Sequence, residues 1–136
     1  MRTPAQHPFN PLAQLRLLLA CAPAGGTPNR RACEAVLRYI WIDGGDANDA
    51  DRMAALTQEL APRVAPDHAS IKQALKDSTA EALALGIFGV PTIAFEGRLF
   101  WGLDALPMLR AALLGDAWFG GPAWDAAGQP RPGVKR

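Results

Sequence analysis

Hydrophobic residues in the first two thirds of the chain recur at helical spacing, between breaks that are rich in proline and glycine. In one stretch the spacing is i, i+3, i+4, i+7 and i+8, which predicts a single apolar stripe, made of Cys33, Val36, Leu37, Ile40 and Trp41. The pattern as a whole predicts four helices, over about 11–22, 29–42, 50–61 and 67–85.

Residues suited to helix starts precede three of these segments. Asn10 suits the cap of the first helix, and Pro11 suits its first turn because proline needs no backbone donor there. Asn48 or Asp49 suits the cap of the third helix, and Asp67 the cap of the fourth. We therefore expect a helical region over residues 1–85, with an irregular lead-in before the first helix.

The next segment, residues 86–114, has the pattern of two strands and a helix. Thr92–Phe95 and Arg98–Trp101 read as short strands, and Glu96-Gly97 between them is close to the Asp-Gly signal of a two-residue hairpin. Gly102 ends the second strand, and Asp104 suits the N-cap of a helix over 105–114.

Residues 115–136 are expected to form an irregular tail, because Gly120-Gly121-Pro122 and the stretch 128–132 disfavour regular structure. Lys135 and Arg136 would be free charges at its end. The tail also carries three large aromatic residues, which are too apolar for a purely solvated segment: Trp118, Phe119 and Trp124. We expect them to fold back on the body of the protein; a surface for a partner is the alternative.

Size and charge narrow the function classes. A chain of 136 residues with formal net charge +1 fits one ordinary domain and argues against nucleic acid or an anionic membrane as the main partner. No apolar run approaches the roughly twenty residues of a membrane span, and the short apolar run at 17–22 is expected to be helix and not a signal peptide. Cys21 and Cys33 form neither a disulfide framework nor a Cys-x-x-Cys pair, so we expect reduced core thiols in a cytoplasmic protein.

No metal site is expected. The acidic loop 43–49 lacks the closing Glu of a calcium loop. His7 lies in the proline-rich lead-in and His68 in the first turn of a helix, where we expect both to be solvated.

The hairpin itself suggests a binding site. An isolated hairpin has an unpaired edge, and the N–H and C=O of Val90, ahead of Pro91, would be free to pair with an extended peptide. The segment from Gly102 to Asp104 brings a helix start whose N–H groups favour a carboxylate, while the Asp104 side chain can accept from an ammonium. Glutathione has a peptide backbone at one end and an amino-acid head at the other, so it fits both.

The residues of this segment, Gly-Ile-Phe-Gly-Val-Pro-Thr-Ile over 86–93 and Glu-Gly-Arg-Leu-Phe-Trp-Gly-Leu-Asp over 96–104, resemble the C-terminal half of 2-hydroxychromene-2-carboxylate isomerases. These enzymes are related to kappa-class glutathione transferases and to DsbA-type thiol-disulfide oxidoreductases. The resemblance extends over about 8–114 and implies a thioredoxin-like α/β fold with an inserted helical domain. It implies glutathione as cofactor and a small aromatic-derived substrate; whether the peptide bond before Pro91 is cis is left open.

Carried over residue by residue, the resemblance places Val90 and Pro91 at the cysteinyl part of glutathione. Its γ-glutamyl end would be held by four residues: Trp101, Gly102, Leu103 and Asp104. Asn10 and Pro11 match a family segment near the substrate. In the family, glutathione thiolate adds to an unsaturated substrate of aromatic catabolism, and elimination after bond rotation completes a cis–trans isomerisation.

One part of the family pattern is missing. The family begins with a β-α-β unit whose first turn carries a catalytic serine, or a cysteine in the oxidoreductases, and this sequence begins after that unit. Ser70 and Ser78 lie within a helical pattern, so no catalytic residue is assigned. We expect a truncated isomerase whose activity is left open. The alternatives are a non-catalytic fragment that binds glutathione or a peptide, or that dimerises through its hairpin, and a relative of the DsbA-like oxidoreductases.

Overall fold

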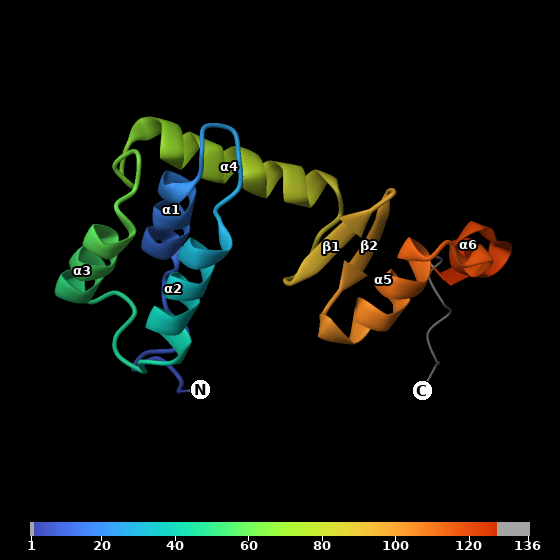
Figure 1. Cartoon of the computed structure of the whole chain (residues 1–136), viewed down its shortest axis with the longest axis horizontal. Coiled ribbons are helices and arrows are strands. Elements are labelled where there is room, and N and C mark those ends of the chain that lie inside the picture. Colours follow the sequence, from blue (N-terminus) through green and yellow to red (C-terminus); the bar gives the residue numbers. More distant parts are fainter. Residues whose placement is uncertain (1, 128–136) are drawn as a thin grey trace, which may run out of the picture. The chain divides into compact units, whose positions relative to one another are not determined.

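A computed structural model of the chain describes residues 2–127 and is shown in Figure 1. The contacts divide the chain into two compact units, with the division between Ala82 and Leu83. Ten elements follow one another: α1 (Leu12–Cys21), α2 (Arg30–Trp41), α3 (Ala50–Leu60), α4 (Ala69–Ala84), β1 (Thr92–Phe95), β2 (Arg98–Trp101), the 3-10 turn η1 (Leu103–Ala105), α5 (Leu106–Leu113), the 3-10 turn η2 (Ala117–Gly120) and α6 (Pro122–Ala127). The order of four helices, a hairpin and a further helix confirms the predicted fold class.

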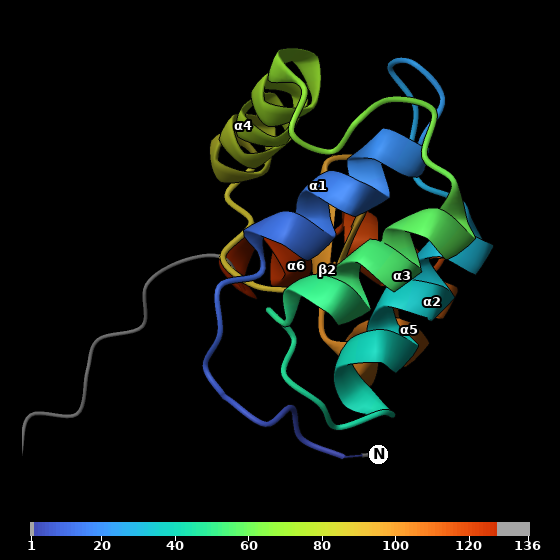
Figure 2. The ribbon, with the colours of Figure 1, turned by 90° about the vertical axis from the view of Figure 1, so that its left-hand side faces the viewer.

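The first unit is built on three helices that lie side by side, with α2 in contact with both α1 and α3 (Figure 2). Their facing sides bury the core of this unit: Leu17, Val36, Tyr39, Ile40, Ala47 and Leu56. Apolar side chains from three helices thus leave water together, which is what stabilises short helices that would be marginal alone.

The buried face of α2 differs from the predicted stripe. Val36 and Ile40 are buried as expected, but Leu37 is 55% exposed and Tyr39 takes a place in the core. The Tyr39 hydroxyl donates to the carbonyl oxygen of Ala47 at 2.9 Å, and the Arg52 guanidinium lies 4.3 Å from the centre of its ring. Because the Tyr39 hydroxyl has a hydrogen-bond acceptor and its ring has a cationic partner inside the unit, α2 buries the face that carries Tyr39 and leaves Leu37 exposed.

Of the predicted caps, Asp49 holds the N-cap position of α3 as expected, whereas in α1 Pro11 holds that position and Asn10 precedes it. The Asn10 side-chain oxygen accepts from the backbone N–H of Leu12 at 3.1 Å, and the Asp49 side chain accepts from that of Arg52 at 2.8 Å. Both supply acceptors for donors that the first turn of a helix leaves free.

The cap of the fourth helix, α4, was predicted wrongly. The helix begins at Ala69, and His68, rather than Asp67, caps it by accepting from the backbone N–H of Ser70 at 3.2 Å. The hydroxyl of Ser70 also lies 2.7 Å from the same ring nitrogen, so His68 is part of the helix start. At 16 residues α4 is the longest helix described, and within residues 2–127 no helix combines the length and apolar character needed to cross a membrane.

The acidic loop between α2 and α3 is organised by an arginine. Arg52 donates to the carbonyl oxygen of Asp46 at 2.6 Å and to that of Tyr39 at 3.1 Å, so its guanidinium lies inside the loop. A side chain on Gly45 would meet this guanidinium, which accounts for the glycine there. In the described part of the chain, no three His, Cys, Asp or Glu side chains gather as they would around a metal ion.

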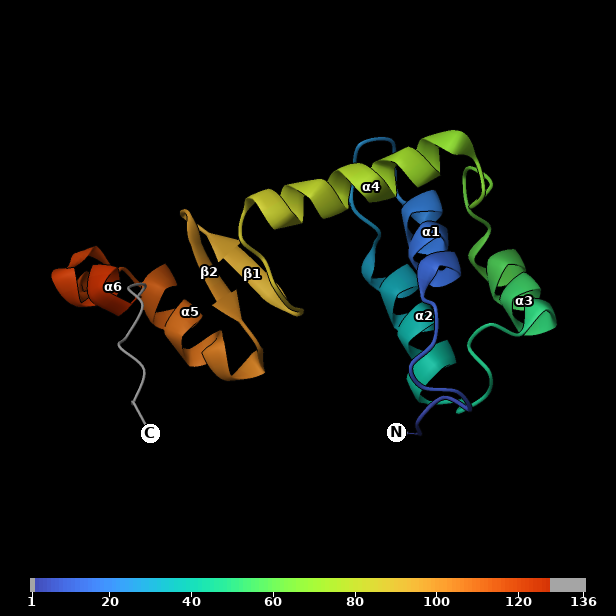
Figure 3. The same ribbon diagram turned by 180° about the vertical axis from the view of Figure 1, so that it is seen from behind.

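The second unit contains the hairpin at its predicted positions, with α5 against β2 (Figure 3). The strands are antiparallel, with Ile93 opposite Phe100 and Phe95 opposite Arg98. Glu96 and Gly97 form the turn with φ of 48° and 74°, as a type I′ turn requires. Positive φ at both central positions matches the twist of the strands, so the acidic-Gly pair was a sound hairpin signal.

Asp104 does not cap the last predicted helix. The segment first makes the short turn η1, whose N-cap position is Gly102, and no side chain caps it. The helix α5 begins at Leu106 with Pro107 in its first turn, where the missing N–H costs nothing. The Asp104 carboxylate is therefore not engaged in a helix cap.

The tail is ordered further than predicted. Residues 117–127 contain η2 and α6 and are not irregular, because the Asp116 side chain accepts from the backbone N–H of Trp118 at 2.9 Å and Pro122 begins the last helix. The prediction that the aromatic residues fold back is confirmed: the rings of Phe119 and Trp124 lie 6.0 and 6.1 Å from that of Phe100 in β2. The glycine- and proline-rich stretch 128–132 and the charges Lys135 and Arg136 lie outside the described residues.

Candidate functional site

The second unit brings six of the predicted site residues to one end of the hairpin, opposite the turn. The end of β2 and the start of β1 are joined there by a hydrogen bond, in which the backbone N–H of Gly102 donates to the carbonyl oxygen of Pro91 at 2.9 Å. Trp101 lies opposite Thr92 in the ladder. Residues on both sides of this bond, 90–91 and 101–104, therefore form one continuous region.

Val90 presents its backbone to the outside. The peptide bond between Val90 and Pro91 is cis, and Val90 is 86% exposed. Among residues 2–127 neither its N–H nor its C=O has a hydrogen-bond partner. An unpaired donor and acceptor on an exposed residue at the entry of a strand can pair with the backbone of an extended ligand.

A pair of aromatic side chains lies beside Val90. The rings of Phe88 and Trp101 are 5.0 Å apart at 54°, and they remain 78% and 52% exposed. Gly89 permits the contact, since a Cβ at that position would lie 2.6 Å from the indole nitrogen of Trp101. The region therefore combines the unpaired backbone groups of Val90 with two exposed aromatic side chains.

Phe88 was not among the predicted site residues. Its signal in the sequence was the pair of glycines that flank Ile87 and Phe88, which suggested backbone freedom but not an aromatic contact. The Phe88–Trp101 pair depends on strand register, so it could be recognised only once the hairpin was placed.

Gly102, Leu103 and Asp104 add polar groups to the same region. Gly102 has φ of 86°, a conformation that favours glycine, and a side chain there would meet the Asp104 carboxylate. Leu103 is 72% exposed, and Asp104 is exposed as well. An exposed carboxylate thus lies two residues from the bond that joins the strands, where it can attract a cationic group.

Asn10 and Pro11 belong to the first unit, and they serve there as the start of α1. The Asn10 amide oxygen accepts from Leu12, and the carbonyl oxygen of Pro11 accepts from the backbone N–H of Leu15 at 3.0 Å. Both residues are exposed. Their contact with substrate remains a prediction.

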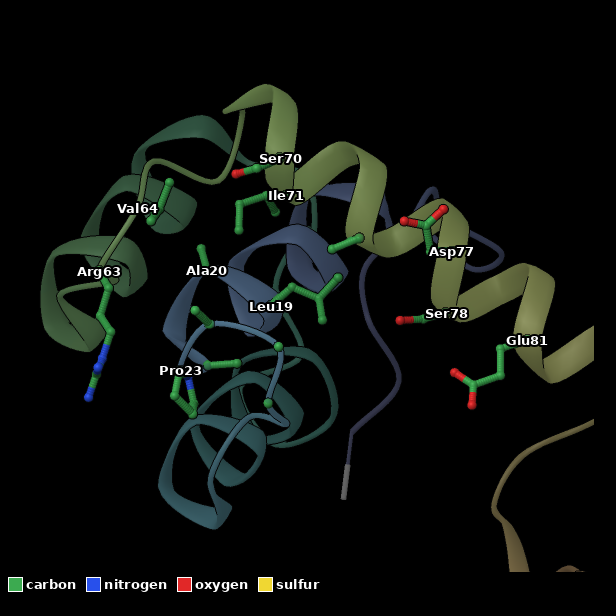
Figure 4. Close-up of a pocket in the computed structure, with 15 residues that line it drawn as sticks. Leu19, Ala20, Pro23, Arg63, Val64, Ser70, Ile71, Asp77, Ser78 and Glu81 are labelled. Atoms are coloured by element: carbon green, nitrogen blue, oxygen red, sulfur yellow. The ribbon is translucent and has the colours of Figure 1, made fainter.

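A concave feature of the first unit is lined by residues outside the predicted site. A cavity of about 610 Å³ lies between one face of α4 and the segment that follows α1 (Figure 4). Leu19, Ala20 and Ile71 give it apolar walls, and Ser78 and Glu81 of α4 line it further along that helix. None of the predicted site residues lines this cavity, so its size alone does not make it the functional site.

The two cysteines lie in the first unit, at the end of α1 and within α2. Both are free thiols and half-buried. Burial raises the pKa of the Cys21 thiol, and the charge of Arg31 offsets this only in part. Because the thiolate is the reactive form, Cys21 is a weak nucleophile.

Comparison with known families agrees with the arrangement of helices, hairpin and final helix. The DSBA-like thioredoxin domain matches the chain over residues 1–114, which is most of its length and includes both the helical unit and the hairpin site. Neither the curated proteins nor the solved structures compared with the chain gave a match. The match confirms the thioredoxin-like fold, and the aromatic segment after residue 114 follows the matched part. The chain therefore belongs to the family of DSBA-like thioredoxin domains.

Proposed function

We propose that this chain binds glutathione at Val90–Asp104. Its function would be that of a glutathione-dependent cis–trans isomerase of the 2-hydroxychromene-2-carboxylate isomerase type. The observation that carries the proposal is the exposed, unpartnered backbone of Val90 beside the aromatic pair and an exposed carboxylate. Membership of the DSBA-like family supports the thioredoxin-like setting but does not distinguish an isomerase from an oxidoreductase.

The residues present fit glutathione in three respects. Val90 offers one N–H and one C=O, which match the C=O and N–H of a cysteinyl residue in an extended peptide. The ring of Trp101 packs against that of Phe88 and gives the region an apolar surface. Asp104 can accept from the ammonium of the γ-glutamyl end through a charge-assisted hydrogen bond.

Bound glutathione would supply a thiolate that adds to a conjugated double bond and leaves again after rotation, with no net oxidation. The residues described here would hold and orient the tripeptide. Val90 would fix the cysteinyl backbone, and Phe88 with Trp101 would shield one side of the sulfur region from water. No residue of this chain is assigned to the chemical step itself.

Calorimetric titration with reduced glutathione tests the proposal. We expect binding in the millimolar range or tighter, weakened about tenfold by Asp104→Asn because a charge-assisted bond is worth roughly 1.5–3 kcal/mol. Asp125→Asn is the matched control, since Asp125 is also an exposed carboxylate in the first turn of a short helix of the same unit. Absence of binding, or equal weakening by both variants, would contradict the proposed site.

A thiol-disulfide oxidoreductase of the DsbA type is the second candidate, and the family match is equally compatible with it. The open backbone of Val90 would then bind a peptide instead of glutathione. An assay of insulin disulfide reduction separates the two, since an oxidoreductase accelerates it and a glutathione-binding isomerase component does not. Cys21→Ala and Cys33→Ala variants show whether either thiol takes part.

A further inference from the structure

The segment that enters β1 is closed by a hydrogen bond from a side chain. The hydroxyl of Thr92, the first residue of β1, donates to the carbonyl oxygen of Gly89 at 2.6 Å. This bond spans the two residues between them, Val90 and Pro91. Thr92 is half-buried, so water competes only in part for its hydroxyl. Residues 89–92 therefore form a closed loop, which one side chain of the strand holds in place.

A second hydrogen bond holds the same loop from the side of β2. The backbone N–H of Gly102 donates to the carbonyl oxygen of Pro91 at 2.9 Å. The carbonyl groups on both sides of Val90, those of Gly89 and Pro91, are therefore already engaged. Within residues 89–91, Val90 has the one carbonyl that accepts from no residue of the described part of the chain.

These two bonds decide how an extended ligand can pair with the loop. In an antiparallel arrangement, one residue exchanges both its N–H and its C=O with a single residue opposite. Pro91 has no N–H, and the C=O of Gly89 is engaged, so only Val90 offers both groups. A ligand that pairs through both groups therefore has a single register, with one of its residues opposite Val90.

We infer that Thr92 is a positioning residue for glutathione, because its hydroxyl fixes the loop that presents Val90 and sets the register of the tripeptide. This inference rests on the proposed function, since it concerns the same site. The ring of Pro91 fixes its own φ, and the bond from Thr92 to Gly89 restrains the rotations that remain. A loop that is already held in its bound conformation loses less entropy on binding, which raises affinity.

Loss of the hydroxyl should have a second effect, on register. The carbonyl of Gly89 would become a further free acceptor, next to that of Val90. An extended ligand could then also donate to Gly89, and the single register would be lost. Thr92 is thus expected to favour one alignment of the ligand in addition to raising its affinity.

Two substitutions separate this role from a general contribution of Thr92 to the strand. Valine has nearly the shape of threonine and the same preference for strands, so Thr92→Val removes the bond to Gly89 and leaves the hairpin ladder in place. Thr92→Ser keeps a hydroxyl at the same position. If the hydroxyl is what matters, the serine variant should resemble the native chain and the valine variant should not.

The first test needs no ligand. The carbon-13 NMR shift of the Gly89 carbonyl depends on whether its oxygen accepts a hydrogen bond. We expect the same shift in the native chain and in Thr92→Ser, and a different shift in Thr92→Val, with similar urea midpoints of unfolding in all three. An unchanged shift in a folded Thr92→Val variant would overturn the inference, irrespective of any result with glutathione.

The second test is calorimetric titration of the same three chains with reduced glutathione. Thr92→Val should weaken binding roughly fivefold, as expected for the loss of one hydrogen bond, and Thr92→Ser should bind like the native chain. Thr79→Val is the matched control, since the Thr79 hydroxyl donates to the carbonyl oxygen of Leu75 at 2.8 Å in α4 of the first unit. This control should also bind like the native chain.

The outcomes distinguish the role of Thr92 from the proposed function. Absence of binding by the native chain would contradict the proposed function and, with it, any role of Thr92 in binding. Native binding that Thr92→Val leaves unchanged, or that Thr79→Val weakens equally, would overturn only the inference on Thr92. A shift of the Gly89 carbonyl on addition of glutathione to Thr92→Val, but not to the native chain, would support the single register. The same shift in the native chain would overturn it.

Discussion

Gly102 donates its backbone N–H to the carbonyl oxygen of Pro91 at 2.9 Å, and this bond holds together the two halves of the candidate site. On one side lies Val90 with its open backbone, and on the other lie Trp101 and Asp104. The site therefore depends on the hairpin ladder, and changes that loosen the ladder should also loosen the site.

The first prediction concerns Gly89. Gly89→Ala places a Cβ 2.6 Å from the indole nitrogen of Trp101, so the ring has to move. We expect a changed near-ultraviolet circular dichroism signal, a loss of roughly 1 kcal/mol in the free energy of unfolding, and weaker glutathione binding. Gly120→Ala is the matched control, because nothing lies within 4 Å of its added Cβ and its φ is not positive. Equal effects of the two variants would contradict the proposed packing.

The second prediction concerns the hairpin turn. Gly97 has φ of 74°, so Gly97→Ala should lower the free energy of unfolding by roughly 1–2 kcal/mol. Glu96→Asn should act in the opposite direction, since Asn accepts positive φ and the exposed ion pair with Arg98 is worth little. Urea denaturation followed by tryptophan fluorescence measures both. Identical effects of the two substitutions would show that the turn geometry does not limit stability.

The third prediction concerns the aromatic segment after α5. Phe119 is 6% exposed, packs on Phe100, and its carbonyl oxygen accepts from the Arg98 guanidinium at 3.0 Å. Phe119→Ala should cost roughly 3 kcal/mol and speed hydrogen exchange in β2. Trp118→Ala should cost less, because that side chain is 42% exposed. If exchange in β2 is unaffected by Phe119→Ala, the segment does not stabilise the hairpin.

The fourth prediction concerns Cys21. Burial raises the pKa of its thiol, so at pH 8 the native chain should be alkylated at Cys21 more slowly than the urea-unfolded chain. The unfolded state also loses this proton at lower pH than the native state. The folded state therefore binds more protons between the two pKa values, and stability falls as pH rises through that window. Mass spectrometry after timed alkylation checks the first point. Faster modification in the native chain would contradict the burial of Cys21.

Much of the fold followed from local patterns. The strands at Thr92–Phe95 and Arg98–Trp101 were predicted at their observed bounds because alternation and the Glu96-Gly97 turn are both local signals. The buried face of α2 was not predicted correctly. Tyr39 becomes a core residue only through its contacts with the following loop and with α3.

Two further differences also involve contacts between side chains. Trp124 in α6 packs on Phe100, which is distant in sequence, and the glycine- and proline-based prediction of an irregular tail took no account of this contact. Of the candidate site, the sequence predicted the region that joins Val90 to Asp104 but missed Phe88, whose contact with Trp101 depends on strand register. The Trp124–Phe100 and Phe88–Trp101 contacts join residues that are distant in sequence, and periodicity does not report such contacts.

The most direct test of the central claim is a titration of isotope-labelled protein with reduced glutathione, followed by amide NMR shifts. We expect saturable shifts at Val90, Leu103 and Asp104, since their backbones border the proposed site, and no shifts at Cys33 or Leu56 in the helical unit. Shifts confined to the helical unit, or none at millimolar glutathione, would contradict glutathione binding at the hairpin.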